Sequence, residues 1–149
     1  MKIAIGCDHG GYLLKQDILI WLEEHDYEFE DFGCYNTESV DYPVYAEKVA
    51  RAVASGACDK GIVICTTGIG VSMAANKVKG IRCALCGDSY SAEMTRRHND
   101  ANMLAMGERV VGPGLAAEIV DAFLGAEFEG GRHADRVELI RQIERKYNK

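Results

Sequence analysis

The segment 65–70, CTTGIG, combines residue types that could do chemistry. A thiol placed directly before a helix N-terminus lies near the positive end of the helix dipole, which favours the thiolate. The two threonine hydroxyls and the N–H groups that open the helix could converge on one negative charge. However, glycine loops often only turn the chain, and free cysteines are often core side chains. The segment therefore predicts either a reactive thiol beside an anion site or a structural turn.

Titratable groups also occur where loops are expected. Asp8-His9 follows the first predicted strand, and His98-Asn99-Asp100 follows a predicted helix. A position on a loop, rather than on an apolar face, favours a functional role. By contrast, His25 lies between Glu24 and Asp26 at a charged helix end and is expected to face solvent.

Arg132 and Arg136 are one helical turn apart and share a helix face, an arrangement that suits a phosphate dianion. The alternative is an ion pair with Glu129, Asp135 or Glu138. The formal charge of −6 argues against a broad nucleic-acid surface, which requires clustered Lys and Arg. An anionic ligand would therefore be attracted by a small local group of arginines.

Length and composition predict one compact domain over residues 1–149, because 48% of the chain is hydrophobic. We expect no signal peptide, no membrane contact and a cytoplasmic location, since no apolar run is long enough for a signal peptide or a membrane span. The six cysteines are interpreted as thiols. Cys83 and Cys86 have CxxC spacing but lack a second pair or paired histidines, so core positions are favoured over a zinc or redox site.

Short apolar runs alternate with longer amphipathic ones, as in βαβ units. Strands are expected at 3–5, 27–32, 61–64, 82–86 and 102–105. Helices are expected from 10–11 to about 24, from 43 to 55, from the glycine loop to about 77, from 88–89 to about 97, from 113 to 124, and after 131 to about 147. The run 61–64 is apolar throughout, which is typical of a central parallel strand.

This alternation predicts an α/β fold, a doubly wound three-layer sandwich with a five-stranded parallel sheet and helices on both faces. Such sheets bind ligands beyond the carboxyl ends of their strands. We therefore expect the loops that begin at Cys7, Cys65, Cys86 and Met106 to share one sheet edge. The charged last helix could contact a partner subunit or present a solvated face.

One pattern joins six segments: 6–11 (GCDHGG), 41–43 (DYP), 64–70 (ICTTGIG), 74–77 (AANK), 96–102 (RRHNDAN) and 129–133 (EGGRH). Together they resemble the ribose-5-phosphate isomerase B family, over nearly the whole chain. The family includes galactose-6-phosphate isomerase subunits and members acting on allose 6-phosphate. The resemblance implies an aldose–ketose isomerase that uses no metal and no cofactor. It also implies a Rossmann-like fold and a homodimer, which could pair into a tetramer, with active sites between subunits.

The resemblance further implies the roles in proton transfer. Cys65 would be the base that moves a proton between C1 and C2 of the open-chain sugar, and Thr67 would relay the hydroxyl proton. Backbone amides would hold the enediolate oxygen, and these belong to Thr66, Thr67, Gly68, Ile69 and Gly70.

Substrate binding is implied in the same way. His98 would open the sugar ring with the help of Asp8, while Asn99 and Tyr42 would hold sugar hydroxyls. The residues implied to bind the phosphate are His9, Arg109, Arg132 and Arg136.

Two positions bear on these roles. One branch of the family uses a glutamate as the base where this chain has Val71, so this chain resembles the cysteine branch. Thr66 stands where the family usually has glycine and is tolerated if its φ is negative.

Among substrates, ribose 5-phosphate is favoured over allose 6-phosphate and galactose 6-phosphate, because one chain carries both the full loop and His98. A non-catalytic phosphate-binding module would leave Cys65, His98 and Asp8 without a joint purpose. A thiol hydrolase would need a base to activate Cys65, and the sequence defines no partner that orients such a base.

Overall fold

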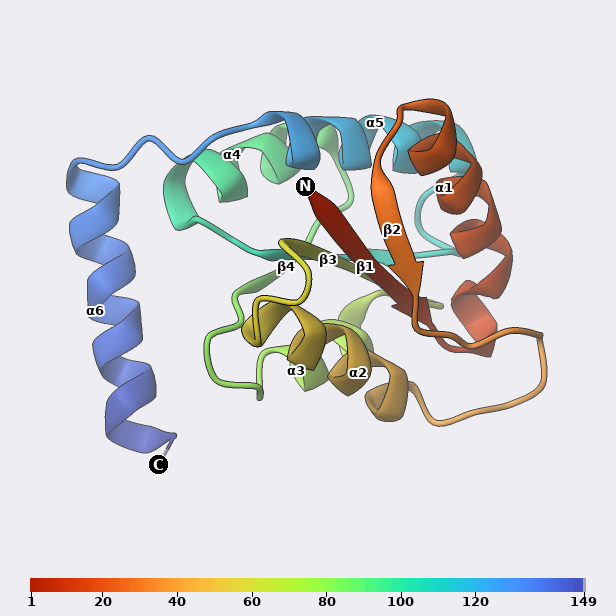
Figure 1. The fold of residues 1–149 in the computed structure, drawn as a ribbon, viewed down its shortest axis with the longest axis horizontal. Helices are drawn as coiled ribbons and strands as arrows, with labels where there is room; N and C mark the ends of the chain where they lie inside the picture. Colours follow the sequence, from red (N-terminus) through yellow and green to blue (C-terminus); the bar gives the residue numbers. More distant parts are fainter. Residues whose placement is uncertain (149) are drawn as a thin grey trace.

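The structure, a computed structural model, describes residues 1–148. Its five strands form one parallel sheet in the order β2-β1-β3-β5-β4 (Figure 1). The strands are β1 (Lys2–Cys7), β2 (Glu28–Asp31), β3 (Lys60–Cys65), β4 (Cys83–Leu85) and β5 (Met103–Gly107). Strand β3 is central, and its residues 61–65 are buried, which confirms the prediction made from that apolar run.

Helices cover both faces of the sheet, so the predicted α/β sandwich is confirmed. They are α1 (Tyr12–Glu24), which follows the short 3-10 turn η1 (His9–Gly11), α2 (Tyr42–Ala54), α3 (Ile69–Ala75), α4 (Ser89–Asn99), α5 (Pro113–Gly125) and α6 (Arg132–Tyr147). One core contains side chains of α1, α4 and α5, and the other contains side chains of α2 and α3. Helix α6 stands at one end of the molecule (Figure 1).

Two helix starts follow from local chemistry. The carboxylate of Asp88 accepts a hydrogen bond from the Ser91 N–H at 2.6 Å, which satisfies one free donor at the start of α4. Pro43 lies in the first turn of α2, where its missing N–H costs no helical hydrogen bond. Both helices begin where the sequence predicted, at about 43 and at 88–89.

Two element ends differ from the prediction because of tertiary contacts. Helix α3 stops at Ala75, and the side chain of Asn76 bonds to both backbone groups of Cys83, at 2.7 Å and 2.9 Å. Strand β4 is shorter than 82–86, since the N–H of Arg82 donates to the Asn102 side chain at 2.8 Å rather than to a neighbouring strand.

Parallel pairing fixes which loops meet. Cys7 is in register with Ile64, and Cys65 with Gly107, so the ends of β1, β3 and β5 lie at one edge. The loops after β1, β3, β4 and β5 therefore share that edge, as predicted. Helices α4 and α5 run back from it, so α6 begins at the opposite edge, where the strands start. In Figure 1 the arrow of β1 points away from α6.

No helix within residues 1–148 is long and apolar enough to cross a membrane. The sequence predicts one domain over residues 1–149, and residue 149 lies outside the described residues.

Candidate active site

Cys65 ends strand β3 at the edge where the loops meet. Its side chain is buried, and the N–H of Gly68 donates to its Sγ at 3.0 Å. This N–H is placed to stabilise negative charge on the sulfur. Thr66 and Thr67 are exposed beside it, and the Thr67 hydroxyl accepts from the Ile69 N–H at 3.2 Å. The loop thus presents a thiol and two hydroxyls at one sheet edge.

The backbone of this loop depends on Gly68. Its φ is +82°, and a Cβ there would lie 2.5 Å from the Leu85 side chain and 2.7 Å from the Met106 carbonyl carbon. The φ of Thr66 is not positive, which is the condition that a threonine at this position has to meet. In the described chain the only non-glycine residues with positive φ are Asp26 and Asp100. A threonine is therefore compatible with the backbone at position 66.

Asp8 and His9 lie on the neighbouring loop after β1. The buried Asp8 carboxylate accepts from the Gly10 N–H at 2.9 Å. A Cβ at Gly10 would overlap the Thr66 hydroxyl, so the two loops are in close contact. The Val40 N–H donates to His9 Nδ1 at 3.1 Å. Since a backbone N–H is always the donor, Nδ1 carries no proton and the neutral ring presents Nε2–H.

Tyr42 and Arg109 complete this edge. The Tyr42 ring lies against Gly70, where a Cβ would be 2.6 Å from its Cε1. The Arg109 N–H donates to the Thr66 carbonyl at 3.1 Å. We call Asp8, His9, Tyr42, Cys65, Thr66, Thr67, Gly68, Ile69, Gly70 and Arg109 the loop group. The structure brings these ten predicted site residues together.

The remaining predicted residues form a second group. His98 and Asn99 end α4, while Arg132 and Arg136 lie in the first two turns of α6. With Glu129 and His133 we call them the α4–α6 group. It lies at the opposite sheet edge from the loop group, separated by the 11 residues of α4, about 16 Å of helix. Within one chain, therefore, His98 and Asn99 do not meet Cys65 or Asp8.

Glu129 connects the two helices of the α4–α6 group. Its carboxylate accepts from Arg97 Nε at 2.7 Å, and its N–H donates to the Arg97 carbonyl at 3.0 Å. The rings of His98 and His133 stack beside it, with centroids 4.1 Å apart and planes 8° apart. These contacts hold the start of α6 against the end of α4.

Arg132 and Arg136 form no ion pair with the acidic side chains of residues 1–148. Glu129 pairs with Arg97 instead, and Glu138 pairs with Arg141 and Arg145. The ion pairs weighed in the sequence analysis are therefore absent from this part of the chain, and both guanidinium groups are exposed.

His133 is the most buried of the four histidines. It is buried, and burial lowers its pKa, helped by the nearby His98 and the positive charge of Arg132. Among the described residues its Nε2 has no hydrogen-bond partner. His25, in contrast, is exposed as predicted and stacks on Trp21.

Sequence reasoning assigned no site role to two residues of the α4–α6 group, although both lie in the segment 129–133 of the family pattern, and it missed one residue near the loops. Glu129 and His133 have the i, i+4 spacing that brings side chains together at a helix start, and this signal was available. Glu108, whose carboxylate accepts from the Leu14 N–H at 2.8 Å and so caps α1, gives no local signal because 94 residues separate the two.

All six cysteines are free thiols in the structure. Burial raises the pKa of Cys83 to about 12 and that of Cys86 to about 11, so both stay protonated at neutral pH. Core packing of the CxxC pair therefore fits better than redox chemistry.

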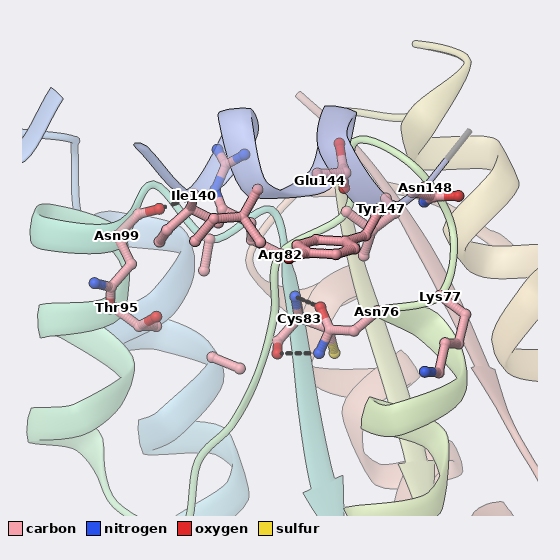
Figure 2. A pocket seen from close by; sticks show the side chains of 14 residues that line it. Asn76, Lys77, Arg82, Cys83, Thr95, Asn99, Ile140, Glu144, Tyr147 and Asn148 are labelled. Carbon is pink, nitrogen blue, oxygen red and sulfur yellow. Dashed lines mark hydrogen bonds between the residues drawn. The ribbon is translucent and has the colours of Figure 1, made fainter. Parts of the chain in front are cut away.

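A pocket of about 700 Å³ opens between α6 and β4 (Figure 2). Ile140 and Tyr147 of α6 face Asn76 and Cys83 across it. Of the predicted site residues, only Asn99 lines it. The pocket is thus distinct from the loop group.

The chain is similar to known proteins over nearly its whole length. The chain matches a family model described as Ribose/Galactose Isomerase over residues 3–140. It is 55% identical over 147 residues to ribose-5-phosphate isomerase B of Escherichia coli (strain K12), covering 99% of each chain. It is also similar to the structure of ribose-5-phosphate isomerase B from Clostridium thermocellum, with a TM-score of 0.97, 62% identity and 99% of each chain covered.

A third similar structure is ribose-5-phosphate isomerase B from Mycoplasma genitalium with bound ribulose-5-phosphate. Its TM-score is 0.92 at 42% identity, with 97% of this chain and 96% of that chain covered. The similarity therefore extends over both the loop group and the α4–α6 group.

Proposed function

This chain belongs to the Ribose/Galactose Isomerase family, and we propose that it interconverts ribose 5-phosphate and ribulose 5-phosphate. The observation that carries the proposal is the Cys65 thiol, which receives the Gly68 N–H at 3.0 Å and lies beside exposed hydroxyls. An aldose–ketose isomerase needs a base at C2 and N–H groups for the developing enediolate, and this loop supplies both.

The proton transfer proceeds in two steps. Cys65 takes the C2 proton of the open-chain aldose and returns it to C1, while Thr67 passes the O2 proton to O1. N–H groups of the loop hold the enediolate oxygen between the steps. Val71 occupies the alternative base position and is fully buried, so Cys65 has no substitute there.

The phosphate anchors the substrate away from the reacting carbons. His9 offers its Nε2–H at the loop group, and Arg109 adds a guanidinium there. Arg132 and Arg136 form the complementary part of the phosphate site from the α4–α6 group.

Because the two groups lie at opposite edges of one sheet, we propose that each active site combines the loop group of one chain with the α4–α6 group of a second copy. In this homodimer His98 opens the sugar ring with the help of Asp8, and Asn99 and Tyr42 bind sugar hydroxyls. The large apolar side chains that α6 exposes support such a contact: Leu139, Ile140, Ile143 and Tyr147.

The proposed chemistry moves only protons, so it requires no metal and no cofactor. The cytoplasmic location and the further pairing of dimers into tetramers stay predictions.

The test follows ribose 5-phosphate in heavy water with a chelator present. Ribulose 5-phosphate should form with deuterium at C1, and the reverse reaction should place deuterium at C2 of ribose 5-phosphate. The proposal fails if neither the ketose nor deuterium incorporation appears. A higher kcat/KM for allose 6-phosphate than for ribose 5-phosphate would contradict the assignment of the sugar.

A further inference from the structure

Three potential metal ligands lie together in the α4–α6 group. The ligand atoms of His98, Glu129 and His133 are all within 4.8 Å of one another. Glu129 Oε1 lies 3.7 Å from His98 Nε2 and 3.6 Å from His133 Nε2. In a tetrahedral zinc site with bonds of 2.0–2.1 Å, neighbouring ligand atoms are about 3.3 Å apart. The carboxylate oxygen is therefore spaced from each nitrogen nearly as a bound metal would require.

A second, independent observation points to a ligand here. His133 is only 7% exposed, and its Nε2, which faces Glu129, has no hydrogen-bond partner within residues 1–148. A buried polar nitrogen left without a partner costs free energy that a bound cation would recover. Nε2 therefore has no competing protein partner, and in the tautomer that carries the proton on Nδ1 its lone pair enters the cluster.

One outer contact orients a ligand, while Arg132 and Arg136 place positive charge beside the cluster. Arg97 Nε binds Glu129 Oε2 at 2.7 Å, which orients the carboxylate and leaves Oε1 for the cluster. Second-shell contacts of this kind hold ligands in place and raise metal affinity.

We infer that His98, Glu129 and His133 bind a borderline transition-metal dication such as Zn²⁺. Two imidazole nitrogens and one carboxylate oxygen favour Zn²⁺ over Mg²⁺ or Ca²⁺, which prefer oxygen ligands. The two rings now stack nearly in parallel, so one must turn to direct its lone pair at the same ion. The half-exposed His98, whose side chain is 38% exposed, is the ring with room to turn.

Bound Zn²⁺ also affects catalysis, which rests on the proposed function. Bound Zn²⁺ occupies the Nε2 lone pair of His98, which is then unable to exchange protons with the ring oxygen of the sugar. Zn²⁺ therefore inhibits isomerisation, and a chelator restores it.

Direct binding tests the site without any activity measurement. Equilibrium dialysis of the metal-free protein against ZnCl₂ should give one Zn²⁺ per chain. Glu129→Gln and His133→Asn should each raise the Kd at least about tenfold, while the exposed His25→Asn serves as the matched histidine control and leaves it unchanged. Because Glu129 lies at the surface, its variant also covers the case in which His133→Asn fails to fold.

The Cys65 thiol is the alternative ligand for Zn²⁺. The absorption spectrum of the protein with Co²⁺ in place of Zn²⁺ distinguishes the two sites. The Co²⁺ protein should show d–d absorption without a thiolate-to-cobalt charge-transfer band, and Cys65→Ser should bind as tightly as the parent. Binding that survives Glu129→Gln and His133→Asn but is lost in Cys65→Ser overturns the inference. Stoichiometric binding that leaves turnover unchanged overturns only the inhibitory consequence, and an inactive enzyme that binds Zn²⁺ overturns only the proposed function.

Discussion

At the scale of single residues, the chemistry depends on the contact between the Cys65 sulfur and the Gly68 N–H. Cys65→Ala should lower kcat by about 100–10,000-fold, because general-base catalysis of this kind contributes roughly 10²–10⁴-fold. Phosphate binding should stay nearly intact, since the phosphate contacts lie elsewhere. Rates of ketose formation and deuterium exchange check the first effect, and binding of inorganic phosphate checks the second.

Cys58→Ala provides the matched control for that variant. Cys58 is also buried, but it lies before β3, at the opposite end of the strand from Cys65. Its removal should leave kcat within about twofold of the parent. Full activity in Cys65→Ala would show that another group is the base.

The phosphate arginines should separate binding from chemistry. Arg132→Ala should raise KM by about 10–100-fold with kcat nearly unchanged, because a hydrogen bond to a charged group is worth about 1.5–3 kcal/mol. Arg141→Ala, on the same helix and paired with Glu138, should change neither constant. Steady-state kinetics on ribose 5-phosphate measures both constants. A lower kcat at constant KM in Arg132→Ala would contradict a role of Arg132 in binding.

The sequence was most informative where local chemistry is distinctive. Cys65 and the threonines after it could be placed at a strand end because a wholly apolar strand precedes them and glycines follow. The burial of His133 could not be predicted, because it results from the packing of α6 against the end of α4 through Glu129 and Arg97.

At the scale of elements, the turn from β3 into α3 requires glycine at position 68. Gly68→Ala forces a left-handed backbone on alanine, which costs about 1–2 kcal/mol, and it adds a clash with Leu85 and the Met106 backbone. Gly56→Ala isolates the first effect, because Gly56 has a similar φ of +83° and open space around it. Denaturant unfolding should show Gly68→Ala less stable than Gly56→Ala by about 1–3 kcal/mol. Equal losses of stability would show that the clash relaxes away.

The elements themselves could be predicted from their periodicity and, for α4 and α2, from a residue at the helix start, as Asp88 and Pro43 show. Their ends were less predictable, since the end of α3 depends on Asn76 meeting β4, which is distant along the chain. Strand order also depends on tertiary packing. The opposite location of His98 does follow from βαβ logic, because a helix that begins at one sheet edge must end at the other.

At the scale of the whole molecule, the loop group and the α4–α6 group are separated by the depth of the sheet, and only a second chain could bring them together. In a two-fold symmetric dimer each site would take one group from each chain. A mixed dimer of Cys65→Ala and His98→Ala would then contain one site with both defects and one site with neither. Two inactive variants should therefore restore activity when their subunits are exchanged.

Random exchange makes half of the dimers mixed, and each of these has one intact site of two, so activity should reach about a quarter of the parent value. The control mixes Cys65→Ala with Thr67→Ala, both proton-transfer residues of the loop group, and should restore nothing, because every site then carries one defect. Activity measured after co-refolding decides between the arrangements. If Cys65→Ala and His98→Ala fail to complement although mixed dimers form, each chain must build its own site, and α4 would have to move far from its present position.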